Sequence, residues 1–267
     1  MKTKKDFVGY YPLLLTGTID SSVYGNTGNR ITDIAERLSQ YEDSIKRYIL
    51  YTPFNPIIFI ENSGFDFDSI KFQKIAEENR KQFEFIRGTV CVKEVMARGK
   101  SFGDAFLIHE ALEKSELLKP HNFFYKITGR IFLKNSYDIV KTRDKYRNEF
   151  ICYTGLGWCL TNIFKANKKD YLEYLDSVYL ECDETKIRDI EISFYYRLNN
   201  ADIQIGSFET YPYFDGIQGA TLRAYSGGEI ERTVRNIFAK MHVFILNSRA
   251  SKIVAWGMKI RGVKPYI

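Results

Sequence analysis

The sequence lacks long apolar runs, a cysteine framework and the short motifs of common hydrolases. No stretch of the 267 residues approaches the roughly 20 apolar residues that would cross a bilayer, so any membrane contact would be peripheral. The four cysteines are scattered and form no Cys-x-x-Cys pair, which argues against a zinc ribbon or disulfide scaffold and favours reduced thiols in a cytoplasm. The GxSxG, HExxH and Walker-type motifs are also absent, and this argues against hydrolases and phosphate-cleaving nucleotidases.

Histidine and excess charge are scarce as well. His109, His121 and His242 are far apart in the sequence and lack metal-ligand spacing, so we assign them no functional role. The 39 basic and 33 acidic side chains leave a formal charge of +6, which is too small and too dispersed for a dedicated nucleic-acid binder. This charge suits a diphosphate-linked substrate, an anionic membrane surface or simple solubility, and it does not choose among them.

The first 60 residues predict a strand, a helix and a second strand. Apolar residues at 13–15 lead into a polar loop that runs to residue 29, and Pro56 opens a second apolar strand that ends at residue 60. The intervening helix begins near Thr32 and ends before Pro53. Its apolar residues at helical spacing are Ile34, Leu38, Tyr41, Ile45, Tyr48 and Ile49. Because ligands collect at the carboxyl ends of parallel strands, the loops there are the expected site.

The rest of the chain predicts an α/β fold with a mostly parallel sheet flanked by helices. Further helices are expected over 68–80, 99–118, 169–180, 187–198 and 229–247, and further strands over 83–87 and 123–127. The segment 150–160 has no clear period. With no internal repeat, we expect one domain over 1–214 and a helical or irregular C-terminal extension over 215–267.

Four motifs carry a family resemblance. They are Leu15-Thr-Gly-Thr-Ile19, Glu61-Asn-Ser-Gly64, Gly99-Lys-Ser-Phe-Gly103 and Lys126-Ile-Thr-Gly-Arg130. In this order and spacing the chain resembles bacterial lipopolysaccharide and capsule glycosyltransferases. The resemblance covers about the first 200 residues and is best between residues 13 and 135. It implies a GT-A-like (Rossmann-like) fold, a nucleotide-activated sugar donor and a saccharide or lipid-linked saccharide acceptor.

The resemblance also implies a donor-binding set at the strand ends. Its members are Thr16, Gly17, Thr18, Arg37, Tyr41, Glu61, Asn62, Ser63, Lys126, Thr128, Gly129 and Arg130. The residues at 16–18 and 61–63 would face the nucleoside, and those at 37 and 41 would pair with the base or a phosphate. Simple alternatives stay open for each group: a strand-to-loop turn, a solvated helix face, and an Asx-type turn with a helix cap.

A metal site is not assigned. Asp66 and Asp68 have the Asp-x-Asp spacing of a divalent-cation site, but they come early in the chain, and Asp68 suits the N-cap of the following helix. At the later position where such carboxylates are expected, the sequence offers Lys126 and Arg130, which could neutralise diphosphate oxygens directly or lie as surface charges beside a turn. A displaced site for Mn or Mg stays open.

Glu191 is the candidate catalytic base, with Asp104 as a second candidate. Sugar transfer with inversion needs a carboxylate that takes the proton of the acceptor hydroxyl. Glu191 stands in Asp189-Ile-Glu-Ile-Ser-Phe-Tyr-Tyr, where resembling proteins also carry an acidic residue before an aromatic pair. A structural ion pair is the alternative for Glu191, and an N-terminal helix cap is the alternative for Asp104.

The sequence therefore predicts a hexosyltransferase-like enzyme that moves a sugar from a nucleotide diphosphate sugar, with a UDP-sugar favoured, onto a growing surface glycan. The alternative is a non-catalytic nucleotide-sugar or glycan-binding subunit of a polysaccharide assembly complex. The basic and apolar segment 251–267 suggests peripheral contact with the inner face of the plasma membrane, or else packing on the domain. No nucleic-acid partner is expected, and the aromatic content leaves a homodimer open.

Overall fold

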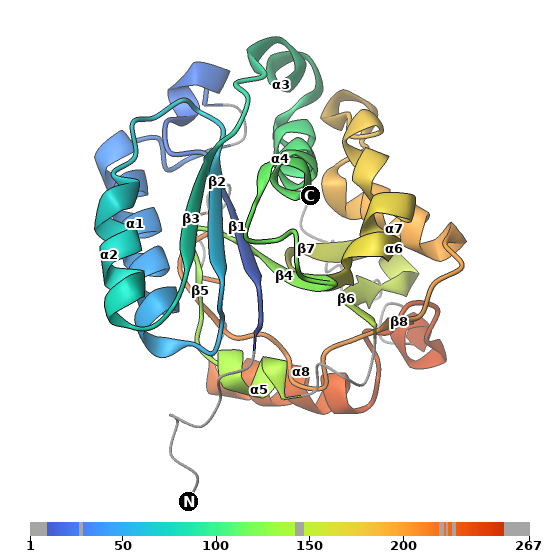
Figure 1. Cartoon of the computed structure of the whole chain (residues 1–267). Coiled ribbons are helices and arrows are strands. Elements are labelled where there is room, and N and C mark those ends of the chain that lie inside the picture. Colours follow the sequence, from blue (N-terminus) through green and yellow to red (C-terminus); the bar gives the residue numbers. More distant parts are fainter. Residues whose placement is uncertain are drawn as a thin grey trace, which may run out of the picture.

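The computed structural model describes residues 10–26, 29–141, 147–218, 222, 224–225 and 228–253. Its centre is a seven-stranded sheet in the order β3-β2-β1-β4-β7-β6-β8 (Figure 1). The strands are β1 Leu13–Gly17, β2 Ile57–Glu61, β3 Phe83–Arg87, β4 Phe123–Thr128, β6 Asn148–Tyr153, β7 Trp158–Asn167 and β8 Ile205–Gly206. Strand β1 pairs in parallel with β2 and β4, β2 pairs in parallel with β3, and β7 runs antiparallel to both neighbours.

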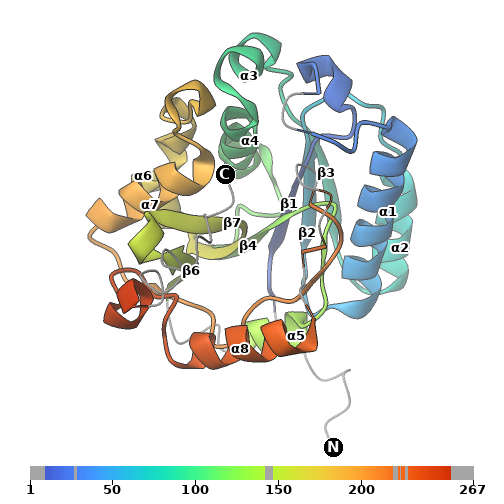
Figure 2. The ribbon, with the colours of Figure 1, turned by 180° about the vertical axis from the view of Figure 1, so that it is seen from behind.

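Helices cover both faces of this sheet, as Figures 1 and 2 show from opposite sides. Helices α1 Ile34–Tyr51 and α2 Ser69–Glu78 lie on one face. The other face carries α4 Lys100–Lys114, α6 Lys168–Tyr174 and α7 Ile190–Asn200, with α3 Val92–Arg98 next to α4. A separate hydrophobic cluster fills each face. The α/β fold with a mostly parallel, helix-flanked sheet that the sequence predicts is confirmed.

Helix α1 shows why the helix predicted between Thr32 and Pro53 forms. Asp33 caps it by accepting a hydrogen bond from the backbone N of Glu36 at 2.7 Å, which satisfies an otherwise unpaired amide. Tyr41, Ile45 and Tyr48 lie on its buried face, against the sheet. The helix ends at Tyr51 because the prolines that follow cannot continue it.

The segment 150–160 forms most of an antiparallel hairpin. Strands β6 and β7 are joined by a short 3₁₀ turn at Thr154–Leu156, and Gly157 closes it with φ of 67°. Most residues of both strands are buried on either face of the sheet. A strand covered on both faces has no polar side, so the alternation that identifies a strand in the sequence is missing.

The C-terminal part packs on the same hydrophobic cluster as α1 and β1. Strand β9 Phe214–Asp215 pairs with β5 Phe132–Leu133, and α8 Glu229–Lys240 lies beside α5 Ser136–Val140 at the lower edge of both views. Ala239, Val243 and Phe244 belong to this cluster. The division at residue 214/215 stays a prediction, and residues 254–267, which hold most of the basic segment, lie outside the described residues.

Within the described ranges, none of the helices combines the length and apolar character that membrane crossing requires.

Candidate functional site

The predicted motifs meet where the parallel strands end. Gly17 at the end of β1 stands opposite Glu61 at the end of β2, and Thr16 stands opposite Thr128 at the end of β4. Three segments separated by up to about a hundred residues in sequence are therefore neighbours at one sheet edge. This is the edge at which parallel α/β sheets bind ligands.

The loops after β1 and β2 are joined by a ladder of hydrogen bonds. The hydroxyl of Thr18 donates to Asn62 Oδ1 at 2.7 Å, and the backbone N of Ile19 donates to Glu61 Oε1 at 2.8 Å. The backbone N of Asp20 donates to Ser63 Oγ at 3.0 Å. Residues 61–63 thus fix the path of the loop after β1. A direct contact of these residues with a nucleoside stays a prediction.

Arg37 and Tyr41 reach the same loop from α1. The guanidinium of Arg37 is buried and donates to the carbonyls of Ile19 at 2.9 Å and Ile31 at 3.1 Å, besides that of Thr18. The hydroxyl of Tyr41 accepts from the backbone N of Thr18 at 3.0 Å. In the folded chain both side chains hold the loop in place, so their pairing with a base or phosphate remains a prediction.

Gly17 is required by packing at this edge. A Cβ at Gly17 would lie 2.6 Å from Tyr41 Cε1 and 2.8 Å from Phe59 Cε2, within a tilted aromatic pair. Gly129 is tight in the same way, because a Cβ there would lie 3.0 Å from the carbonyl O of Thr16. The two glycines let β1, β4 and α1 approach closely.

We expect Gly17→Ala to lower the free energy of unfolding by about 1–3 kcal/mol, because the new methyl overfills a close-packed site. Urea denaturation of the wild type and the variant measures the loss. In a Tyr41→Leu background the same substitution should cost less, because the crowding ring is gone. An equal cost in both backgrounds would contradict a clash with Tyr41.

Glu191 lies at the start of α7 and faces β7. The hydroxyl of Thr161, on β7, donates to Glu191 Oε1 at 2.9 Å. Burial, with the nearby Asp189 carboxylate adding to it, raises the pKa of Glu191 to about 7, although the Thr161 hydrogen bond opposes the shift. A carboxylate with a pKa near neutrality accepts a proton more readily than an ordinary glutamate, which is the property a general base needs.

Asp104 and Lys126 share the electrostatic environment of Glu191. Asp104, on α4, is accessible to solvent, yet enough protein surrounds its carboxyl that desolvation raises its pKa, against the pull of Lys126 and Lys100. Lys126, on β4, is only 3 % exposed, and its Nζ donates to the carbonyl of Thr161 at 2.9 Å. Burial lowers the pKa of Lys126, whereas Asp104 and Glu191 raise it. Its ammonium therefore acts on two carboxylates, and a direct diphosphate contact by Lys126 stays a prediction.

Arg130 provides the more accessible cation of the site. It follows β4, is half-buried, and donates from Nη1 to the carbonyl of Ile217 at 2.8 Å and to Gln40 Oε1 at 3.3 Å. These bonds engage one nitrogen and hold the guanidinium at the edge of the sheet. The predicted role of Arg130 as a diphosphate contact is compatible with this position and stays a prediction.

Tyr225 also belongs to this site, and sequence reasoning did not select it. Burial raises the pKa of its hydroxyl against the opposing charge of Arg130, and the carboxylates of Glu191 and Asp104 raise it further. It lies in the irregular segment before α8, where no periodicity or motif marks it. The glycines around it, at 216, 219, 227 and 228, were the one feature of the sequence that marked this segment.

The remaining acidic candidates do not form a cation site. Asp68 accepts from the backbone N of Lys71 at 3.2 Å and caps α2, and Asp66 lies 3.2 Å from Arg87. Among the described residues no three His, Cys, Asp or Glu side chains gather as a metal ion requires, and Lys126 already places a cation beside Asp104 and Glu191. The described residues therefore do not fit a divalent ion.

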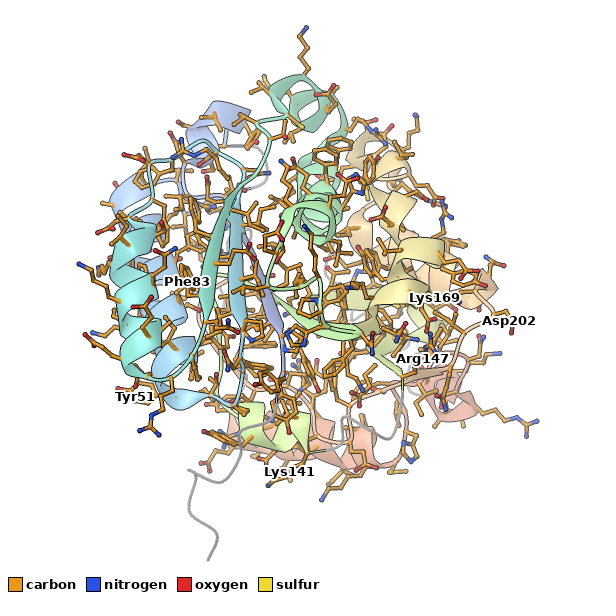
Figure 3. The ribbon with its side chains drawn as sticks, in the orientation of Figure 1. Tyr51, Phe83, Lys141, Arg147, Lys169 and Asp202 are labelled. Atoms are coloured by element: carbon orange, nitrogen blue, oxygen red, sulfur yellow. The ribbon has the colours of Figure 1, made fainter. Side chains whose placement is uncertain are left out.

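A hollow elsewhere on the surface is separate from this site. It measures about 720 Å³ and is lined in part by Arg147 and Lys169, which Figure 3 labels at the side of the molecule that carries α6. Asn122 and Asn167 also line it. They lie beside the N-terminal end of β4, whereas residues 128–130 lie at its C-terminal end. Arg147 is held there by Asp170 at 2.7 Å.

No family model and no curated protein sequence matches the chain. Solved structures with a similar architecture include the glycosyltransferase GlyE of Streptococcus pneumoniae, with a TM-score of 0.45 and 12% identity over 75% of this chain and 45% of GlyE. They include core-mannan synthase A of Aspergillus fumigatus, with a TM-score of 0.45 and 10% identity. That match covers 88% of this chain and 86% of the synthase chain. They also include an active-site mutant of LgtC, with a TM-score of 0.47 and 8% identity. That match covers 84% of this chain and 83% of the LgtC chain. At these values function must be argued from the residues of the chain itself.

Proposed function

We propose that the chain is a glycosyltransferase that moves a sugar from a nucleotide diphosphate sugar to a saccharide or lipid-linked acceptor during synthesis of a cell-surface polysaccharide such as O-antigen or capsule. One observation carries the proposal: Glu191, with its pKa near 7, lies in one charge cluster with Asp104, Lys126 and Arg130 at the carboxyl edge of the sheet. The motif resemblance over the first 200 residues supports the same reaction class.

The proposed reaction uses these groups in distinct roles. The acceptor hydroxyl oxygen forms a bond to the anomeric carbon, and the bond from that carbon to the donor phosphate oxygen breaks. The hydroxyl proton passes to the Glu191 carboxylate, and the electron pair of the broken bond stays on the nucleoside diphosphate. The Arg130 guanidinium stabilises the charge that develops on this leaving group, because a fixed cation in a partly dry site interacts strongly with phosphate oxygens.

Lys126 is a positioning residue in this proposal. Its buried ammonium is bonded to the Thr161 carbonyl, and Thr161 also donates to Glu191. Lys126 therefore holds the strand segment that orients the base and favours the ionised forms of Asp104 and Glu191. Asp104, which is accessible, is placed to bind a hydroxyl of either sugar.

A nucleotide screen tests the donor part of the proposal. The purified chain is heated with UDP-, GDP-, CMP- and dTDP-sugars, each with EDTA and with Mn²⁺, and release of the nucleotide is measured in parallel. We expect one nucleotide class, with UDP-sugars favoured, to raise the melting temperature and to be hydrolysed slowly in EDTA. Stabilisation that appears only with Mn²⁺ would contradict the metal-free donor site.

The Arg130→Ala variant should lose most of this stabilisation, with donor affinity falling by about 10-fold or more, because a charge-assisted contact to phosphate is removed. Arg87→Ala is the matched control, since Arg87 ends β3 and makes an exposed pair with Asp66. Equal affinity in the two variants would contradict the role of Arg130. Donor binding without hydrolysis or transfer would favour a non-catalytic nucleotide-sugar-binding subunit.

A further inference from the structure

Helix α8 exposes four apolar side chains in one stripe, while Ala239 and several polar side chains face the protein. Ile230 is 83 % exposed, Val234 42 %, Ile237 49 % and Met241, which caps the helix, 61 %. Their spacing of four, three and four residues places them in one stripe along the helix. We call these four residues the α8 stripe. A surface helix normally has the opposite orientation, with its apolar stripe on the core.

Polar contacts hold α8 to the domain on the other side. Asn236 Oδ1 accepts from the backbone N of Tyr211 at 2.9 Å. The Arg232 guanidinium lies 4.4 Å from the centre of the Tyr213 ring, and that of Arg235 lies 5.0 Å from the centre of the Tyr211 ring. Because the helix is anchored through these groups, the outward direction of the α8 stripe is fixed by the fold.

The charged side chains of α8 and of the described segment after it that have no ion-pair partner are positive. The acidic residues of α8, Glu229 and Glu231, are each paired with an arginine of the same helix. Lys240, Arg249 and Lys252 are exposed and form no ion pair with another residue in the described ranges. Lys240 ends α8, and Arg249 and Lys252 follow in the last described segment, which lies near the C-terminal end of that helix (Figures 1 and 2).

We propose that the α8 stripe docks on the surface of a membrane that contains anionic lipids. An exposed apolar stripe buries itself at the boundary between headgroups and acyl chains, and unpaired lysine and arginine side chains beside it are attracted to anionic headgroups. A protein partner would also cover apolar residues, but the unpaired cations at the end of α8 and in the segment that follows it match the negative charge of a lipid surface. The inference does not depend on the proposed reaction, because it rests on α8 and the residues that follow it.

Vesicle sedimentation of the full chain tests the proposal. Vesicles of phosphatidylcholine with about 30 mole per cent of the anionic lipid phosphatidylglycerol are compared with vesicles of pure phosphatidylcholine. We expect the wild type to bind the anionic vesicles at low salt and to release as salt rises. Val234→Glu/Ile237→Glu should weaken binding by about 10-fold or more, since two charges enter the apolar boundary.

The control carries the same charge change on other helices. Ile70 on α2 and Met96 on α3 are 62 % and 63 % exposed, so Ile70→Glu/Met96→Glu should bind vesicles nearly as the wild type does. Circular dichroism verifies that each variant is folded. The proposal is overturned if the wild type ignores anionic vesicles, or if both double variants bind equally well. It is overturned too if the stripe variant converts a wild-type dimer to a monomer without any effect of vesicles, because a second copy would then be the occupant.

Discussion

Glu191→Gln is expected to lower turnover of the proposed transfer by about 10²- to 10⁴-fold, the range that a positioned general base contributes. The substitution keeps the size of the side chain and its hydrogen bond with Thr161 but removes the group that takes the acceptor proton. Donor affinity should stay near the wild-type value, because Glu191 does not contact the diphosphate in the proposal. Steady-state kinetics in which the donor concentration is varied separate turnover at saturating donor from the apparent affinity for the donor.

The pH dependence adds a signature that a structural role would not give. The base must be ionised to accept a proton, so the wild-type rate should rise with pH through about 7, where burial and Asp189 have moved the pKa of Glu191. This acid limb should vanish in Glu191→Gln. Thr161→Val removes a hydrogen bond that favours the ionised form, so its limb should move to higher pH with activity retained at alkaline pH.

Asp104→Asn distinguishes the two carboxylates. The Asp104 charge contributes to the raised pKa of Glu191, so its removal should move the acid limb to lower pH and preserve much of the maximal rate. If Asp104→Asn abolishes turnover while Glu191→Gln retains it, the roles of the two carboxylates are the reverse of those proposed. If the rise in rate near pH 7 persists unchanged in both variants, both assignments are contradicted.

Much of the sheet could be predicted because most of its parallel strands are marked by short-range sequence patterns. The apolar runs that became β1, β2 and β4 each stop at a polar or glycine residue, and Pro53 limits α1. The segment that became β6 and β7 was ambiguous because the strands are buried on both faces. Whether a strand is covered on one face or two depends on tertiary packing, which short-range periodicity does not encode.

The candidate site was predictable in part for the same reason. Parallel strands bring their carboxyl ends together, so residues 16–18, 61–63 and 128–130 were expected to be neighbours. The sequence did not reveal that Arg37 and Tyr41 hold the loop after β1 or that Lys126 is buried beside two carboxylates. Tyr225 could not be found because its approach depends on the path of the whole C-terminal segment.

The other large effect is expected from Glu149→Gln, which should lower the free energy of unfolding by about 3–5 kcal/mol. Glu149 on β6 and Lys165 on β7 form an ion pair with 3.2 Å between Oε2 and Nζ, and their side chains are 0% and 4% exposed. The variant keeps the shape of the side chain but removes the charge, so the Lys165 ammonium loses its countercharge in a region with little water. Chemical denaturation measures the loss.

Two comparisons isolate the cause. Glu42→Gln breaks the pair between Glu42 and Lys71, which has nearly the same length but is 32% and 47% exposed, and should cost about 1 kcal/mol or less. Glu149→Leu/Lys165→Met removes both buried charges together and should recover much of the stability lost in Glu149→Gln. If Glu149→Gln costs no more than Glu42→Gln, burial does not make this pair important. The distinction matters for the site, because the hairpin that the pair joins is the one that carries Thr161 to Lys126 and Glu191.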